Sequence, residues 1–394
     1  DGVVEQFHGG GLGLEDRLHD VHRFIEGREA QHGQSLHRGA GVEFETSAEG
    51  DGEGALATAD EVGEIDGVEI AGICEPEDAL RNQRQQDWGI AKAYPDSETF
   101  FHEVQPDAVV IATPNKFHRE LILEAFANGC HVICEKPLGM DYAETVQLYN
   151  AAKAAGVKAM MAFTYRFVPG MKYLRHLVRS GELGEIRHAR FQRLQDWGDF
   201  AIGWRQYKAM AGSGELGDMG IHRIDLAQDL LGPITAVCAA TKQLLPRDRT
   251  RDGQTVPPQD VEDWVAWIAE FQNGATGVFE MGKLTKGYSP TGDHDLAELN
   301  GTKASAVYRL HTPHEILFGK RGEPYRAIPV PTEYLTRPGS PRDPQEGDPQ
   351  RTFRYDQAWE FVSAIREERD PVPSFYDGMR AQAVADSILL AASE

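Results

Sequence analysis

The sequence predicts an α/β protein. Its first part is a doubly wound parallel sheet, and its second part is an α+β domain with a mostly antiparallel open sheet. From residue 68 onward, short apolar runs alternate with helical patterns, and this alternation indicates a parallel sheet covered by helices. After Tyr165 the pattern changes, and five strand patterns between residues 234 and 310 are joined by turns that contain glycine. A chain of 394 residues is long enough for two domains with cores of their own.

The first part shows strands and helices in regular order. We expect strands over 68–74, 107–112, 131–134 and 157–163, and helices over 79–88, 97–104, 119–128 and 142–155. Gly129 and Gly156 follow two of these helices, at the position where glycine commonly ends a helix.

The second part is expected to contain six strands and four helices. The strands are expected over 185–196, 234–244, 261–271, 275–283, 295–300 and 304–310, and the helices over 169–180, 217–231, 356–368 and 378–393. Residues 330–352 carry many prolines and glycines, so we expect a loop there. The helix over 217–231 should cover one face of the sheet.

Residues 1–66 do not follow this pattern. Five of the fourteen histidines fall in the first 37 residues, and no lysine precedes Lys92. Residues 3–7 resemble a short strand before a glycine cluster at 9–13, but Asp16 stands where a dinucleotide fingerprint needs its third glycine. We therefore expect an atypical N-terminal segment over 1–66, in which the first strand and the glycine loop of such a sheet are absent or degraded.

The composition excludes several classes of partner. The formal net charge of −22 argues against nucleic acid and anionic membranes, because both require a basic face. No apolar run approaches the length of a membrane span, and no secretory signal pattern is present. Cys74, Cys130 and Cys134 lie in or near apolar strand patterns. We expect buried free thiols there, as in the reducing cytoplasm.

The ends of the predicted parallel strands carry polar residues, and ligands bind at this edge of open α/β sheets. Glu135 and Lys136 follow the strand over 131–134 and precede Pro137; they form either a ligand site or a solvated ion pair. Glu75 follows the strand over 68–74. Its carboxylate could accept hydrogen bonds from both hydroxyls of an adenine ribose, or it could be an ordinary acid near a helix start.

A third strand end carries Thr113, Pro114, Asn115 and His118. The proline fixes the turn, so that a flat ring could lie against it, and Asn115 or His118 could contact a ligand. The alternative is a capped helix start with Asn115 as the cap. Arg166 follows the last strand of the first part and should face the cleft between the two parts.

A glycine-rich stretch over 212–225 leads into the predicted helix over 217–231. Asp218 and His222 are four residues apart and therefore share one helical face. A carboxylate beside a histidine raises its pKa and fixes its orientation, which suits a general base; the alternative is a surface pair. Trp204–Arg205 could provide stacking and an anion contact, or a core aromatic beside a surface charge. We expect no metal site, because no further ligand pair has matching spacing.

Together these motifs resemble the glucose–fructose oxidoreductase, inositol dehydrogenase and rhizopine catabolism (Gfo/Idh/MocA) family. The resemblance extends from Val68 to the C-terminus. It rests on Ala112-Thr113-Pro114-Asn115-x-x-His118, Glu135-Lys136-Pro137 and Gly214-x-Leu216-x-Asp218-x-Gly220-x-His222-x-x-Asp225, in the order in which the family has them. The resemblance implies a Rossmann-type dinucleotide-binding domain, which would continue over 67–138, and a substrate and oligomerisation domain over 139–394.

The resemblance also implies roles for individual residues. Lys136 resembles the lysine that hydrogen-bonds the reacting hydroxyl, His222 the general acid/base and Asp218 its partner. Glu75 resembles the ribose-binding acid, which favours NAD over NADP. Other positions resemble residues of the cofactor cleft: Thr113, Pro114, Asn115, His118, Glu135 and Arg166. Trp204–Arg205 resembles a pair that reaches the cofactor from the second domain.

We therefore expect an enzyme, an NAD(P)-dependent oxidoreductase that transfers a hydride between a nicotinamide cofactor and a hydroxyl or keto carbon of a sugar or an inositol-like polyol. The resemblance also implies a cytoplasmic homodimer or homotetramer that associates through the C-terminal sheet. The alternative is a catalytically impaired relic, or a regulatory sugar- or dinucleotide-binding protein of the same fold.

Overall fold

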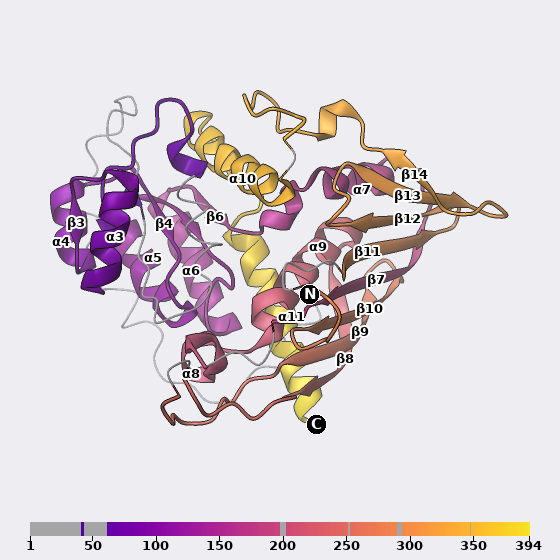
Figure 1. Ribbon diagram of the computed structural model, residues 1–394. Helices are drawn as coiled ribbons and strands as arrows, with labels where there is room; N and C mark the ends of the chain where they lie inside the picture. Colours follow the sequence, from indigo (N-terminus) through magenta and orange to yellow (C-terminus); the bar gives the residue numbers. More distant parts are fainter. Residues whose placement is uncertain (1–40, 43–60, 198–201, 251–252, 290–293, 347) are drawn as a thin grey trace.

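The computed structural model describes residues 41–42, 61–197, 202–250, 253–289, 294–346 and 348–394. A small parallel sheet and a large, mostly antiparallel sheet lie on opposite sides of the molecule, and the C-terminal helices lie between them (Figure 1). This arrangement confirms the predicted fold class. The candidate strand at 3–7 and the glycine cluster at 9–13 lie outside the described residues.

The small sheet has the strand order β1-β4-β5-β6, and all neighbouring strands are parallel. These strands are β1 (Gly41–Val42), β4 (Ala108–Ile111), β5 (His131–Cys134) and β6 (Ala159–Met161). A second parallel pair, β2 (Ile73–Cys74) and β3 (Ala93–Tyr94), lies beside β1. The parallel sheet thus includes β6, which lies after residue 138; the domain boundaries at 66 and 138 stay predictions.

Four helices accompany these strands: α3 (Asp78–Trp88), α4 (Ser97–Val104), α5 (His118–Ala127) and α6 (Tyr142–Ala155). Aspartates start two of them, because their side chains accept the otherwise unpaired N–H groups of the first turn. Asp96 accepts from the Thr99 N–H at 2.8 Å, and Asp141 from the Glu144 N–H at 2.9 Å. Gly156 ends α6 in the left-handed conformation, with φ of 66°, as the sequence predicted.

The large sheet has the order β14-β13-β12-β11-β7-β10-β9-β8, and only the β7–β10 pair is parallel. Its strands are β7 (Ile186–Leu194), β8 (Ile234–Lys242), β9 (Trp264–Phe271), β10 (Thr276–Gly282), β11 (His294–Gly301), β12 (Ala304–Arg309), β13 (Glu315–Lys320) and β14 (Arg326–Pro329). The sequence did not predict β13 and β14. Both are short, and β14 is an edge strand that ends in a proline.

Helices cover the inner face of this sheet. They include α7 (Pro169–Arg179), the π-helical turn η4 (Leu216–Gly220) and α9 (Ile221–Leu231). The predicted helix over 217–231 is therefore divided, and its first turn is wider than an α-helical turn. The short helix α8 (Lys208–Ala211) leads towards η4. Short 3₁₀ turns complete the connections: η1 (Asn115–Phe117), η2 (Thr164–Phe167), η3 (Trp204–Gln206) and η5 (Thr332–Tyr334).

The C-terminal helices join the two sheets. Helix α10 (Pro349–Arg366) packs against η2, whereas α11 (Phe375–Ser393) contacts α6 and β6 on one side and α9 and β8 on the other. Figure 1 shows α11 running between the two sheets. Gly378 of α11 lies so close to Met161 that an added Cβ would come within 2.9 Å of the methionine side chain. This contact places α11 close against the first sheet.

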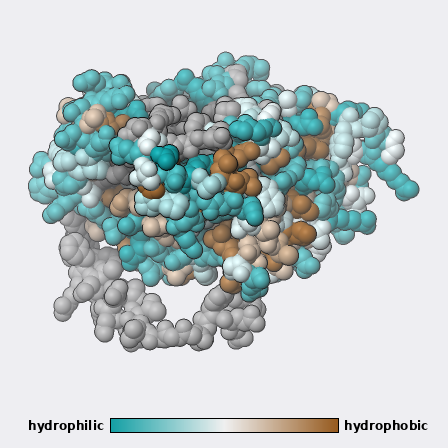
Figure 2. Space-filling view, turned by 60° about the horizontal axis from the view of Figure 1, so that its bottom comes forward, coloured by the Kyte–Doolittle hydropathy of each residue, from teal (hydrophilic) through white to brown (hydrophobic). Residues whose placement is uncertain are grey.

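The surface does not suggest a membrane span: within the described ranges, no helix is both long enough and apolar enough to cross a bilayer. Hydrophobic side chains gather near the middle of the face shown in Figure 2, among many hydrophilic ones. The large sheet contributes apolar side chains to the surface, including Ile268 and Val278, which are 56% and 38% exposed. Cys74, Cys130 and Cys134 are buried free thiols, as predicted, and Cys238 is exposed.

Candidate active site

Lys136 and Asp218 bring the two sheets together at the edge of the parallel sheet. Lys136 lies just after β5, and its ammonium donates to Asp218 Oδ1 at 2.7 Å and to the Asp218 carbonyl at 2.8 Å. Asp218 belongs to the wide turn η4. Burial alone would raise the pKa of Asp218, but Lys136 and Arg205 hold it well below its ordinary value. An ammonium has three N–H groups, so one remains for a ligand oxygen.

His222 lies one turn after Asp218, in α9, and is only 4% exposed. Phe163 and Tyr165 contact it edge-on, with ring centroids 5.9 Å and 4.8 Å from that of the imidazole. Neither ring nitrogen hydrogen-bonds to a described residue, and Nδ1 is also sealed from solvent. Nε2 is therefore the nitrogen that remains open to a ligand.

Asp218 raises the pKa of His222, as expected, but other effects outweigh it. Burial lowers the pKa of His222 well below its ordinary value, and Lys136 and Arg223 lower it further, whereas Asp218 opposes them without prevailing. The Asp218 carboxylate is bound to Lys136 rather than to the imidazole. His222 is consequently neutral near pH 7, and a neutral imidazole can accept a proton.

The third strand end, after β4, is held by its own side chains. His118 is fully buried, and its Nδ1 and Nε2 lie 2.8 Å and 2.9 Å from the carbonyl oxygens of Pro137 and Thr113. His118 thus links the ends of β4 and β5; burial lowers its pKa to about 4. Asn115 donates to the Ala211 carbonyl at 2.8 Å, which ties this strand end to α8. The sequence did not reveal the contacts with Pro137 and Ala211, because these partners lie 19 and 96 residues away along the chain.

Thr113 is the residue of this strand end whose side chain lacks a partner. It is 4% exposed, and its hydroxyl is sealed from solvent and has no hydrogen-bond partner within the described part of the chain. Pro114 is also buried and starts the turn η1. A buried hydroxyl without a partner is costly.

Arg166, which was expected to face the cleft, is buried and bound to aspartates. Its guanidinium donates to Asp225 at 2.7 Å and 2.5 Å and to Asp377 at 2.9 Å, and Asp229 lies 3.8 Å away. Burial would lower the pKa of Arg166, but Asp225, Asp377 and Asp229 raise it above its ordinary value. Arg166 therefore ties η2 to α9 and α11. Asp225, the last residue of the glycine-rich motif, is therefore bound to Arg166.

The acidic residues at the strand ends differ in their surroundings. Glu75, after β2, is fully buried, and its Oε1 accepts the N–H of Glu77 at 2.7 Å near the start of α3. This contact agrees with the second interpretation of Glu75, as an ordinary acid near a helix start. Burial raises the pKa of Glu135, which Lys136 and Arg205 oppose.

Trp204 and Arg205 stack on each other in η3, with the guanidinium carbon 4.3 Å from the ring centroid. Arg205 lowers the pKa of both Asp218 and Glu135. The pair from the second part of the chain therefore lies within electrostatic reach of the end of β5; that it reaches the cofactor stays a prediction.

Two charged residues near this site were not singled out from the sequence. Glu215 immediately precedes η4 and is fully buried, and Lys283 follows β10 and is 8% exposed. The available signal was an acidic residue within an otherwise small and apolar stretch, from Ala211 to Leu216. Gly214 beside it has no room for a side chain, because an added Cβ would lie 2.0 Å from the Glu262 carbonyl.

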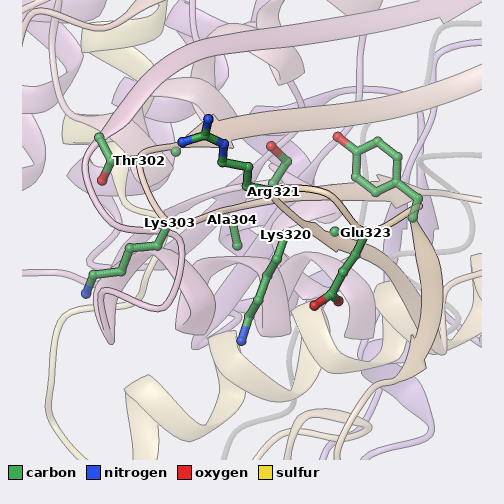
Figure 3. A pocket seen from close by; sticks show the side chains of 10 residues that line it. Thr302, Lys303, Ala304, Lys320, Arg321 and Glu323 are labelled. Atoms are coloured by element: carbon green, nitrogen blue, oxygen red, sulfur yellow. The ribbon is translucent and has the colours of Figure 1, made fainter.

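One surface pocket within the described ranges lies elsewhere. It has a volume of about 310 Å³ and is formed by the turns that join β11 to β12 and β13 to β14. Figure 3 shows Lys303, Lys320 and Glu323 extending from its wall, with Arg321 on the other side. None of the residues discussed above lines it, and the lysine Nζ of Lys303 is held by the Gly181 carbonyl at 3.0 Å. This pocket takes no part in the candidate active site.

Metal coordination is not indicated either: among the residues that the structure describes, no group of three or more His, Cys, Asp or Glu side chains could hold an ion. The site instead combines a neutral histidine, a lysine–aspartate pair and an unpartnered threonine hydroxyl at the ends of parallel strands. Ligands bind at the strand ends of open α/β sheets, and a base beside a cation can transfer a proton and stabilise a developing negative charge.

Comparison with known families agrees with this chemistry. The profile described as "Oxidoreductase family, NAD-binding Rossmann fold" matches residues 51–163, and that of the "GFO/IDH/MocA C-terminal domain" matches residues 171–307. The chain belongs to the GFO/IDH/MocA family of oxidoreductases. Its first domain is an NAD-binding Rossmann fold, and NAD is its cofactor.

Individual relatives cover most of the chain. The levoglucosan dehydrogenase of Pseudarthrobacter phenanthrenivorans is 29% identical over 343 residues, which are 82% of this chain and 87% of that protein. The D-glucoside 3-dehydrogenase of Escherichia coli is 31% identical over 214 residues, 52% of this chain and 60% of that protein. The solved structure of levoglucosan dehydrogenase in complex with NADH and levoglucosan has a TM-score of 0.80 and 27% identity, covering 90% of this chain and 98% of that one.

Proposed function

We propose that this protein is an NAD-dependent dehydrogenase of sugars or polyols, which interconverts a secondary hydroxyl and a keto group. The observation that carries the proposal is the neutral, unpartnered imidazole of His222 beside the Lys136–Asp218 pair. A base and a cation at one point are what oxidation of an alcohol requires. The relatives that are named dehydrogenases of levoglucosan and of D-glucosides support this class of substrate.

The residues at the strand ends fit the nicotinamide part of the cofactor. The buried hydroxyl of Thr113 lacks a protein partner, and Pro114, Glu135 and the Trp204–Arg205 pair surround the same edge of the sheet. Glu75, at the end of β2, would hold the ribose of the adenosine half, which favours NAD over NADP. The cofactor supplies the redox chemistry by accepting or returning a hydride.

The side chains of this protein would manage the proton and the charge. His222 Nε2 takes the proton of the reacting hydroxyl, because the neutral ring has a free lone pair. The third N–H of Lys136 donates to the same oxygen and stabilises the negative charge that develops there. Asp218 holds the ammonium in position through its carboxylate and its carbonyl, so it acts as a positioning residue. In the reverse direction, His222 returns the proton.

We also propose a substrate, a cellular location and an oligomeric state. The substrate would be a cyclic sugar such as levoglucosan, or an inositol-like polyol. The protein would act in the cytoplasm, which its three buried free thiols support. It would form a homodimer or homotetramer through the large sheet, where Cys238, Ile268 and Val278 are directly opposite one another on neighbouring strands and exposed. An apolar row of this kind commonly becomes buried on association.

The test is NADH formation by the full-length protein with a panel that contains levoglucosan, L-sorbose, a D-glucoside and myo-inositol. We expect turnover of at least one, and we expect Lys136→Ala and His222→Ala to abolish it while the circular dichroism spectrum is unchanged. Lys242→Ala and His102→Ala, which alter exposed residues, are matched controls. Unchanged turnover in either site variant would refute the assignment. NADH binding without turnover of any sugar would favour the regulatory alternative, and no NADH binding would favour the relic.

A further inference from the structure

The imidazole of His222 is held without a hydrogen bond. Neither ring nitrogen has a partner in the part of the chain that the structure describes, and Nδ1 is sealed from solvent. The carboxylate of Asp218, one turn earlier, is bound to Lys136 instead. A histidine that acts as a base is usually oriented by a hydrogen bond from its second nitrogen to a carboxylate or a carbonyl. Another kind of contact must therefore fix the direction in which Nε2 points.

Aromatic rings make this contact. Tyr165, in η2, meets the imidazole of His222 edge-to-face, with ring centroids 4.8 Å apart and ring planes at 83°. Phe163 makes a longer contact of the same kind, at 5.9 Å and 70°. An edge-to-face contact is directional, and its contribution to stability is similar to that of a hydrogen bond. Tyr165, the closer of the two rings, therefore restricts the rotation of the imidazole most.

The ring of Tyr165 is itself held by two buried arginines. The guanidinium carbon of Arg223 lies 4.5 Å from the centroid of this ring, and that of Arg193 lies 5.5 Å from it. Phe353, in α10, contacts the same ring at 5.6 Å. A cation over an aromatic ring is attracted by the electrons of the ring, most strongly where water is excluded. Groups from α9, β7 and α10 thus fix the tyrosine ring against His222.

Arg223 has few other partners that would explain its burial. It is 1% exposed, and it shares a single oxygen of Asp295 with Arg193. Its Nε and Nη1 atoms are sealed and have no hydrogen-bond partner among the described residues. Burial of a cation without a full set of partners is costly. A cost of this kind is expected where a residue serves function rather than stability.

We propose that Tyr165 is the positioning residue of His222. Its ring, held in place by Arg223, takes the part of the missing hydrogen bond and keeps Nε2 of the imidazole directed at the reacting hydroxyl. Arg223 acts through Tyr165 and is a second positioning residue. This inference rests on the proposed function, because it takes His222 as the base.

The same arrangement places positive charge close to the base. Burial is the largest cause of the low pKa of His222. The charged groups that act on the imidazole are Lys136, Arg223, Asp218 and Arg193, and only Asp218 raises the pKa. Cations beside an imidazole disfavour its protonated form. Arg223 should therefore affect both the orientation of His222 and the pH range in which the ring is neutral.

The first test separates the ring of Tyr165 from its hydroxyl. The full-length enzyme is assayed with NAD and whichever sugar of the panel is turned over best. Tyr165→Leu should lower kcat roughly 10- to 100-fold, because a base out of position costs rate in this range, and should change KM for the sugar by less than about twofold. Tyr165→Phe keeps the ring and should stay within about threefold of the wild-type kcat. If Tyr165→Leu does not fold, Tyr165→Met replaces it.

The matched control is Tyr173→Leu. Tyr173 stacks on another histidine, His176 of α7, with ring centroids 6.1 Å apart, and its loss should leave kcat and KM at the wild-type values. Two readouts distinguish a positioning role of Tyr165 from a purely structural one. The solvent deuterium isotope effect on kcat should be larger in Tyr165→Leu, because proton transfer to His222 then limits the rate. Binding of NADH and of the sugar, measured by calorimetry, should be unchanged.

The second test concerns the charge of Arg223. Arg223→Gln removes one cation near His222, so the pKa of the imidazole rises and the base is protonated up to a higher pH. The acid limb of kcat/KM should therefore move upward by about half a pH unit or more. Arg223→Lys keeps the charge and should leave the acid limb unchanged. Arg187→Gln, which alters an exposed residue of β7, is the control.

Several results would overturn the inference. An equal loss of kcat in Tyr165→Phe and Tyr165→Leu would give the role to the hydroxyl. An unchanged kcat in the leucine or methionine variant, a rise in KM alone, or an acid limb that does not move in Arg223→Gln would also contradict it. In each of these cases the proposed function stands. Unchanged turnover in His222→Ala, or no turnover of any sugar by the wild type, would overturn the proposed function and with it this inference.

Discussion

Glu215 should make the stability of the folded protein depend on pH, and Glu215→Gln should remove this dependence. Burial raises the pKa of Glu215 from its ordinary value of 4.5 to about 8. Lys283 and Arg193 oppose this rise, whereas Asp218 and Glu262 increase it. Between these pH values the folded protein holds a proton on Glu215 that the unfolded chain has released. Stability therefore falls as the pH rises through this range, and does not change further above it.

The size of the effect follows from the same two values. At about 1.36 kcal/mol per pH unit, the difference between the two pKa values of Glu215 corresponds to a loss of stability of at most roughly 5 kcal/mol. Urea unfolding of the wild type and of Glu215→Gln, at intervals from pH 5 to pH 9, gives the difference in the free energy of unfolding at each pH. We expect the free energy of unfolding of the variant to rise steadily relative to that of the wild type up to about pH 8. A constant difference would show that the Glu215 carboxylate is ionised in the fold, and would refute the reasoning.

Three further predictions concern other parts of the site. Arg166→Ala should lower the free energy of unfolding by about 3–5 kcal/mol, as measured by urea unfolding, because it leaves buried aspartates without their cation. A variant that keeps its stability but loses NADH affinity would instead make Arg166 a cofactor contact. Glu75→Ala should weaken NADH binding at least about tenfold, which is the loss expected for a hydrogen bond to a charged group. In fluorescence titrations it should also reduce the preference for NADH over NADPH; an unchanged preference would leave Glu75 as a helix-start residue only. The acid limb of the oxidation rate should lie below pH 6.5, the ordinary pKa of histidine, since His222 stays neutral to lower pH; an acid limb above pH 6.5 would contradict the assigned base.

The sequence predicted the parallel part well wherever local signals were complete. The strand over 131–134 and the helix over 142–155 have the predicted bounds, because an apolar run, an aspartate cap and a terminal glycine define them locally. Of the strand expected over 68–74, Ile73 and Cys74 pair with β3, and Ile70 forms an isolated bridge. Strand length depends on the partner strand, and the partner cannot be seen in a local pattern.

The site was predictable in its residue types but not in its contacts. Lys136 and Asp218 were both singled out, yet their bond joins residues 82 positions apart, and no spacing rule predicts it. The same limit explains Arg166 and Asn115, whose buried partners lie 59 and 96 residues further along the chain. For Arg166, an apparent ligand contact is a contact between elements that holds the site together.

The different roles of His222 and Lys136 follow from the surroundings of each side chain. His222 lies among aromatic rings and cations, so its charged form is disfavoured and the ring is ready to accept a proton. Lys136 lies against a carboxylate and a carbonyl, which accept two of its N–H groups and leave one donor free. The imidazole can therefore accept the proton, while the ammonium donates to the same oxygen. Had Asp218 bound the imidazole instead, its carboxylate would have favoured the charged ring and opposed proton acceptance.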